Sequence, residues 1–156
     1  LAIVSRGGNY LIGIGPDAHG GMSTWIQRGL EQLGDFLRIN GEGIYATRPW
    51  MDIDTLRSES GWSWYATQPK DSESRVFVFG MPPAPSTDEA TELSLEEATF
   101  ASAGLASTWL EIPGKVLEAR ILGSAEPVIV ENREGSSRLV IPQTDLCYAI
   151  GLELTF

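Results

Sequence analysis

Carboxylates are the side chains in this sequence with the widest capacity for chemistry. Two aspartates stand close together at Asp52 and Asp54, and two glutamates are adjacent at Glu96 and Glu97. A retaining glycoside hydrolase needs two carboxyl groups about 5–5.5 Å apart. Both pairs, however, lie in polar stretches, where acidic side chains normally face solvent. We therefore interpret them as surface charge, and we assign neither pair as a catalytic dyad.

The other reactive side chains stand alone. His19 is the single histidine and Cys147 the single cysteine, so no zinc ligand set can be assembled from this sequence. No histidine is placed to activate Ser23, and no G-x-S-x-G elbow is present. The sequence therefore predicts neither a metal site nor a serine nucleophile, and a single cysteine forms no internal disulfide.

Five tryptophans suggest a second kind of chemistry, because aromatic rings can stack on the apolar faces of sugars. They are Trp25, Trp50, Trp62, Trp64 and Trp109. Large aromatic side chains are also substantially buried in most proteins. We interpret each of the five as a packing residue in preference to a sugar platform.

A glycine pattern at Gly13 and Gly15 formally matches a dinucleotide fingerprint, G-x-G-x-x-A. That motif needs a helix that begins at the glycines, so that its first N–H groups meet the pyrophosphate. Pro16 and Gly20 delay the helix until about Ser23. We therefore give nucleotide binding little weight and predict no cofactor.

The composition and charge of the chain limit the classes of partner that it is expected to bind. The chain has 156 residues, of which 42% are hydrophobic and 21% charged, as in ordinary globular proteins. Its net charge of −10 argues against nucleic acid, since phosphate backbones are bound by clusters of Lys and Arg. No apolar run is long enough to predict a membrane span.

The residues that surround the glycine pattern predict a β-α unit. Tyr10–Ile14 reads as a short strand that Pro16 ends, and a helix is expected over Ser23–Asn40, capped by Ser23. One helix face is apolar at spacings of four, three and four, formed by Ile26, Leu30, Leu33 and Leu37. Gly41 is expected to end the helix in the left-handed C′ conformation, with Arg38 in the last turn.

After Trp50 the apolar periodicity changes from helical to alternating. Trp62–Thr67 and Val76–Phe79 are expected to pair as a hairpin, while the acidic stretch 88–106 is either a short helix or an irregular insertion. Further short strands are predicted between turn residues: Trp109–Ile112, Val116–Leu122, Val128–Glu131, Arg138–Ile141 and an alternating run that ends at Phe156. This spacing is typical of an antiparallel β-sandwich.

The segment Gly7–Trp50 also resembles a known family. It reads GGNYLIGIGP, then a loop and helix, then NGEGIY and RPW. This is similar to the end of the catalytic barrel in the α-L-fucosidases of glycoside hydrolase family 29. Gly13 stands where the family usually has asparagine, and His19 where it usually has an acidic residue. Beyond Trp50 the resemblance is confined to Trp62–Ala66, Val76–Pro82 and Ile141-Pro142-Gln143.

This resemblance implies a fold of the α/β plus all-β class: the last β-α unit of a TIM-type barrel followed by an antiparallel β-sandwich. The expected domains are residues 1–50 for the end of the barrel, 51–60 for a linker and 61–156 for the sandwich. Because the chain starts at Leu1 and enters directly on the Gly7-Gly8 turn, we expect it to be a C-terminal fragment.

The implied activity is retaining exo-hydrolysis of α-L-fucosyl linkages in glycans, in a secreted or lysosomal (extracytoplasmic) setting. The nucleophile and the acid/base are then expected upstream, with no catalytic residue in this chain. Because barrel active sites form at the carboxyl ends of the strands, the loop after the last strand is expected to form part of the pocket wall. Its residues are Gly13, Gly15, Pro16, Asp17 and His19.

Two other functions compete with this one. The sandwich and its tryptophans are compatible with a non-catalytic carbohydrate-binding or interaction module, and the glycine pattern with a nucleotide-binding fragment. Neither of them requires the Asn40–Trp50 stretch, which therefore favours the fucosidase interpretation.

Overall fold

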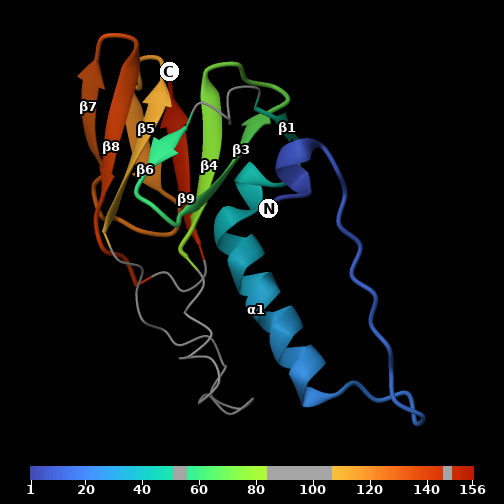
Figure 1. Cartoon of the computed structure of the whole chain (residues 1–156). Helices are drawn as coiled ribbons and strands as arrows, with labels where there is room; N and C mark the ends of the chain where they lie inside the picture. The colour runs from blue at the N-terminus through green and yellow to red at the C-terminus, as the bar shows by residue number, and fades with distance from the viewer. Residues whose placement is uncertain (51–55, 84–106, 146–148) are drawn as a thin grey trace.

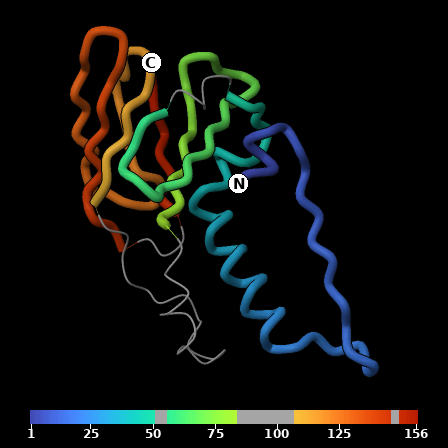
Figure 2. The backbone as a smooth tube through the Cα atoms, in the orientation of Figure 1, coloured from blue at the N-terminus to red at the C-terminus, as the bar shows by residue number. Residues whose placement is uncertain are grey.

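The computed structural model describes residues 1–50, 56–83, 107–145 and 149–156. An N-terminal segment and one helix are followed by two antiparallel sheets that pack face to face (Figure 1). The helix and the segment before it extend away from the sheets, on the side of the five-stranded one (Figure 2). The predicted fold class was the last β-α unit of a TIM-type barrel followed by an antiparallel β-sandwich, and its helix and its sandwich are confirmed.

Helix α1 spans Thr24–Asn40 and follows the predicted signals. Ser23 is extended at the N-cap, where its Oγ accepts a hydrogen bond from Ile26 N at 3.4 Å. Arg38 occupies the last turn and pairs with Asp35 at 2.8 Å. The apolar face is less exposed than the rest of the helix, but all four of its side chains are only half-buried: Ile26, Leu30, Leu33 and Leu37.

The predicted strand over Tyr10–Ile14 is not formed. Between the 3-10 helix η1 (Val4–Arg6) and α1, residues 7–23 contain neither helix nor strand. A strand needs a neighbour that hydrogen-bonds to its backbone, and in Figure 1 this segment runs apart from both sheets. Its apolar side chains are exposed, Leu11 to 93%.

The predicted left-handed end of α1 at Gly41 is also wrong. Gly41 is right-handed, with φ −59° and ψ −32°, and the chain continues as a 3-10 turn, η2 (Gly41–Gly43). A Cβ at Gly41 would lie 3.1 Å from the Tyr45 ring. The constraint at Gly41 is therefore a tight contact with the Tyr45 ring and not a positive φ.

The described strands form two sheets, of five and four strands. The five-stranded sheet runs β1 (Thr47–Pro49), β3 (Ser63–Pro69), β4 (Arg75–Met81), β9 (Ile150–Thr155) and β6 (Glu118–Ile121). The four-stranded sheet runs β2 (Arg57–Ser58), β5 (Thr108–Pro113), β8 (Ser136–Ile141) and β7 (Ile129–Arg133). All the strand pairs are antiparallel.

The strands and the hairpin that were predicted after Trp50 are confirmed in the described residues. Strands β3 and β4 pair antiparallel, with Tyr65 opposite Phe79. Strands β7 and β8 form a second hairpin at Gly135, which has φ 79° and so occupies a conformation that glycine tolerates best. Only strands were predicted from residue 109 to residue 156. In the described part of this range, residues 109–145 and 149–156, the structure contains no α-helix.

The main core lies between the two sheets. Alternate residues of β5, β8 and β9 point inward and are fully buried, as the alternating pattern predicts: Leu110, Ile112, Leu139, Ile141, Ile150, Leu152 and Leu154. Burying a side chain of this size stabilises the folded state by about 1.5–3 kcal/mol. The sandwich therefore has its own core.

A second, smaller core covers the opposite face of the five-stranded sheet. Phe77 and Phe79 of β4, together with Leu122, are buried there. Leu1 and Ile44 pack over them. The start of the chain and the turn after α1 thus close the face of the sheet that the sandwich leaves open.

The division into residues 1–50, 51–60 and 61–156 stays a prediction. Strand β1 precedes its first boundary and pairs with β3, while β2 falls inside the expected linker. The expected helix or insertion at 88–106 lies outside the described residues.

Candidate functional site

The loop before α1 is organised by one carboxylate. Asp17 Oδ1 accepts hydrogen bonds from the backbone N–H groups of His19 and Gly21, each at 2.8 Å. Asp17 N donates to Gly21 O at 2.8 Å, and Gly20 takes φ 80° to close the turn. Asp17 therefore holds the shape of this loop, and the loop sets the point at which α1 begins.

The residues predicted to form the wall of a pocket all lie on this exposed part of the chain. Gly13, Gly15 and Pro16 lie on the extended segment, and Asp17 and His19 lie in the turn that follows it. The structure brings Asp17 and His19 together, while the other three precede them along the chain. Their role as a pocket wall stays a prediction.

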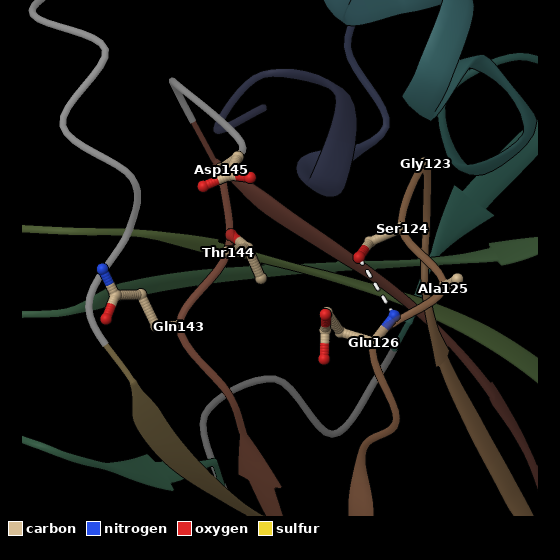
Figure 3. A pocket seen from close by; sticks show the side chains of 7 residues that line it. All are labelled: Gly123, Ser124, Ala125, Glu126, Gln143, Thr144 and Asp145. Atoms are coloured by element: carbon tan, nitrogen blue, oxygen red, sulfur yellow. Dashed lines mark hydrogen bonds between the residues drawn. The ribbon is translucent and has the colours of Figure 1, made fainter.

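The structure contains a cavity of about 550 Å³ that sequence reasoning missed. Two loops form it, 123–126 after β6 and 143–145 after β8, and Figure 3 shows the side chains of Glu126, Gln143 and Asp145 around it. Ser124 Oγ accepts from Glu126 N at 3.1 Å and so fixes one rim. The only sequence signals were the turn residues Gly123-Ser124 and Pro142-Gln143, which do not show that the two loops meet.

The turn after α1 is tightly packed on the sheet. Thr67 Oγ1 of β3 donates to Gly43 O at 2.6 Å. A Cβ at Gly43 would lie 2.6 Å from Phe79 Cζ, and one at Gly151 would clash with Asn40 Oδ1. Asn40 also donates from Nδ2 to Phe36 O at 3.1 Å. The Asn40–Gly43 stretch, which carried the family resemblance, is therefore where the helix joins the sandwich.

Charged side chains reinforce this junction. Glu153 of β9 accepts hydrogen bonds from Arg75 Nε at 2.7 Å and from Arg120 Nε. Both arginines also lie 3.6 Å from Glu42 Oε2, on the turn after α1. We call these four residues the junction cluster. Because Glu153 is only 11% exposed, its interactions are screened less than those of a surface pair.

Four of the five tryptophans pack as the sequence predicts. Trp50 stacks on Phe156, and Trp62 on Trp64 at 5.6 Å between centroids. Arg138 lies over the Trp109 ring, 4.7 Å from its centroid. Trp25, at the start of α1, is 57% exposed, so the packing prediction is wrong for this ring within the chain.

The described residues hold neither a metal cluster nor a membrane helix. Within them, no group of three or more His, Cys, Asp or Glu side chains is arranged to bind a metal ion. No helix among them is long and apolar enough to cross a membrane.

Comparison with known proteins finds similarity to a family of enzymes. The model of the α-L-fucosidase family matches residues 1–42. Human plasma α-L-fucosidase is 41% identical over 69 residues, and rat tissue α-L-fucosidase is 44% identical over 69 residues. The chain is thus similar to α-L-fucosidases over this part of its sequence. Each of these matches covers 44% of the chain and 14% of the relative.

The fold extends the likeness to α-L-fucosidases beyond the matched sequence. The crystal structure of Thermotoga maritima α-fucosidase has a TM-score of 0.64 and 21% identity, covering 98% of this chain and 32% of that one. An α-L-fucosidase from Paenibacillus thiaminolyticus has a TM-score of 0.63 over 98% of this chain and 32% of its own. The chain thus spans about a third of each solved enzyme, and the sandwich is part of the shared fold.

Proposed function

We propose that this chain is the C-terminal part of a retaining exo-glycosidase that hydrolyses α-L-fucosyl linkages in glycans. It supplies the last barrel strand and helix together with a supporting β-sandwich. The observation that carries the proposal is the match of the α-L-fucosidase family model to residues 1–42, which include α1, together with identities of 41% and 44% to two α-L-fucosidases over 69 residues.

The exposed apolar surface supports a role as part of a larger protein. Tyr10 is 67% and Leu11 93% exposed, on a segment that lacks a strand partner in this structure. A single strand leaves its backbone groups unpaired, and apolar side chains on it invite association. We infer that upstream barrel elements pair with Tyr10–Ile14 and cover the apolar face of α1.

The catalytic residues are proposed to lie upstream of Leu1. Retaining hydrolysis requires a nucleophile and an acid/base about 5–5.5 Å apart. Asp17, the carboxylate closest to the expected pocket, is already bonded to two backbone N–H groups of its own loop. Its proposed role, with Gly13, Gly15, Pro16 and His19, is to shape the pocket wall.

The partners and location follow from the same family. We propose fucosylated glycans or glycoconjugates as substrates, since one solved relative, from Thermotoga maritima, is described in complex with fucose. Relatives called plasma and tissue α-L-fucosidase support a secreted or lysosomal location. The alternative, a carbohydrate-binding module, is less favoured because Trp50, Trp62, Trp64 and Trp109 are all engaged in ring or cation contacts.

The test is fucose release from an aryl α-L-fucoside by the 156-residue chain and by the longer protein that contains it. We expect the chain to be inactive and the longer protein to turn over. Deleting 51–156 from the longer protein should reduce its stability more than it alters the chemistry of the enzyme that remains folded. Turnover by the chain that scales with its concentration and is lost in Asp17→Asn would refute the upstream assignment.

A further inference from the structure

The four-stranded sheet presents a face that nothing among the described residues covers. The five-stranded sheet is covered on one side by this sheet and on the other by η1 and the turn after α1. Strands β5, β8 and β7 lie on the side of the sandwich away from α1 (Figure 1). In β5 and β8 every second residue is buried, so the residues between them face outward on that side. We call this surface the outer face.

Strand register arranges charges on the outer face in an alternating row. Arg57 lies opposite Glu111, Glu111 opposite Arg138, and Arg138 opposite Glu131. The row therefore reads plus, minus, plus, minus across all four strands. Arg57 and Glu131, at its two ends, are exposed, and the two central residues are half-buried. Glu131 pairs with Arg133 of its own strand at 3.3 Å, and none of the described ion pairs contains any of the other three.

An apolar row runs parallel to the charged one. Trp109 lies opposite Val140, and Val140 opposite Ile129, which is 59% exposed. The two rows are two residues apart along each strand, which is about 7 Å. The outer face thus combines an aromatic and aliphatic stripe with a regular charge pattern.

We propose that the outer face binds a second copy of this chain, forming a symmetric dimer. Its two-fold axis runs along the strands between β5 and β8. Rotation about that axis exchanges β2 with β7 and β5 with β8, so each positive residue meets a negative one. Glu111 faces the second copy's Arg138, and Arg57 faces its Glu131. Trp109 packs on Val140 of the second copy in the same arrangement.

The charge order selects this axis over the other face-to-face two-fold. An axis across the strands, through the charged row, would place every residue on its own copy, with Arg57 against Arg57 and Glu111 against Glu111. Like charges placed together at an interface are strongly unfavourable. Self-complementary patches are what two-fold dimers require, and the alternating row is self-complementary in one orientation only.

The size of the outer face sets the expected strength. Four strands about 4.8 Å apart span roughly 15–20 Å, which is small for a specific interface. Stable interfaces bury about 1,200–2,000 Å² in total. The dimer is therefore expected to dissociate in the micromolar range and to weaken as salt screens the charge pairs.

Charge-reversal variants test the proposal in mixtures. Arg57→Glu alone places two glutamates together at the interface, the substituted side chain against Glu131 of the second copy. Glu131→Arg alone places two arginines together, so each single variant should be monomeric. When the two variants are mixed, both interface pairs become oppositely charged, and a heterodimer should form. Energy transfer between donor-labelled and acceptor-labelled samples measures this directly, with sedimentation velocity to give the mass.

A second pair and a salt series complete the design. Glu111→Arg and Arg138→Glu, at the centre of the row, should likewise be monomeric alone and associate when mixed. If a central variant fails to fold, the variants at the exposed ends of the row still test the proposal. Association through the apolar face of α1 would be equal in all pairings and would persist in high salt. We expect at least a tenfold tighter association in the mixed pair than in either variant alone.

Three results would overturn the proposal. One is equal energy transfer in mixed and unmixed samples. Another is a wild-type mass that, at low salt and rising protein concentration, increases no more than the masses of the single variants do. The third is a monomeric wild type whose tryptophan fluorescence changes with L-fucose and no longer does so in Trp109→Ala, since the outer face would then bind a sugar.

Discussion

Gly43 has a hydrogen atom in place of a side chain, and this allows the turn after α1 to lie directly on the five-stranded sheet. A Cβ at this position would lie 2.6–2.8 Å from the Phe77 and Phe79 side chains. Sequence alone suggests a flexible turn at this glycine, whereas the structure shows that the turn lies directly on two aromatic rings. Its small size thus lets the backbone after α1 reach the sheet and form the Thr67 hydrogen bond.

Gly43→Ala is expected to destabilise the chain by about 1–3 kcal/mol, because the added methyl group must displace two buried rings. Urea denaturation followed by tryptophan fluorescence measures the change. Gly34→Ala is the matched control, since a Cβ there meets nothing within 4 Å. It lies inside α1, where alanine is favoured over glycine by up to about 1 kcal/mol. Equal effects of the two substitutions would contradict the packing argument.

Glu153→Gln tests the junction cluster at the same scale. The substitution keeps the size of the side chain but removes the charge that Arg75 and Arg120 share. Because both arginines are about half-exposed, water replaces part of the lost interaction. We expect the free energy of unfolding to decrease by about 1 kcal/mol. This decrease should be smaller in about 1 M salt, where charges are screened within a few ångströms. Asp35→Asn, at the exposed pair with Arg38, is the control and should change little.

At the scale of elements, the helix and the sandwich depend on burial to different extents. Leu139 of β8 is fully buried between the sheets. Leu33 of α1 belongs to the predicted apolar face but is half-buried in this structure. The same leucine-to-alanine substitution should therefore have different consequences in the two elements.

Leu139→Ala is expected to cost about 2–5 kcal/mol in the chain, because it leaves a cavity in the core. Leu33→Ala should cost less than about 1 kcal/mol there, which is closer to a surface change. In the longer protein, where barrel elements are proposed to cover α1, Leu33→Ala should cost about 2–5 kcal/mol. Chemical denaturation of both proteins decides this, and a loss under about 0.5 kcal/mol in the longer protein would mean that this helix face is not core.

The same elements show what sequence can and cannot predict. Ser23 and the alternation of Ile150, Leu152 and Leu154 are local signals, and they correctly placed α1 and β9. Tyr10–Ile14 failed as a strand because pairing depends on a neighbour outside the segment. Gly41 failed as a left-handed cap because sequence does not distinguish glycine needed for a positive φ from glycine needed for space.

The candidate site was predictable only in part, for the same reason. The loop of Asp17 and His19 was located by its glycines and its family resemblance. The cavity between loops 123–126 and 143–145 depends on contacts between two separate parts of the chain. The junction cluster joins Glu42, Arg75, Arg120 and Glu153 from four distant segments. No local pattern marks such long-range meetings.

At the scale of the whole molecule, differences in burial predict that strands β4 and β9 resist local unfolding better than helix α1 does. Strands β4 and β9 are central in the five-stranded sheet, and their inward side chains are fully buried. Helix α1 extends from the sheet at its C-terminal end, with its other end beyond the sandwich (Figure 1). Amide hydrogens open with free energies that follow such differences in packing.

Native-state hydrogen exchange should therefore separate the chain into two units. Amides of β4 and β9 should exchange only through global unfolding, whereas those of the first half of α1 should exchange faster by about a hundredfold or more. Mass spectrometry of peptides from the two regions gives the comparison. Uniform protection along α1 and β9 would show that the helix and the sandwich open together.

The exposed segment 7–22 also acts as a tether, and cutting it would have a distinct effect. Residues 1–6 stay on the sheet partly because the chain holds them near Phe77 and Phe79, so their binding is intramolecular. Residue 11 lies in exposed, irregular backbone, the kind of site that proteases cleave first. In the 156-residue chain tested by itself, one such cut would release residues 1–11 as a short peptide, and the rings beneath it would become available to a hydrophobic dye. A trimmed chain that binds such a dye while keeping its sheet content is the expected product of mild proteolysis.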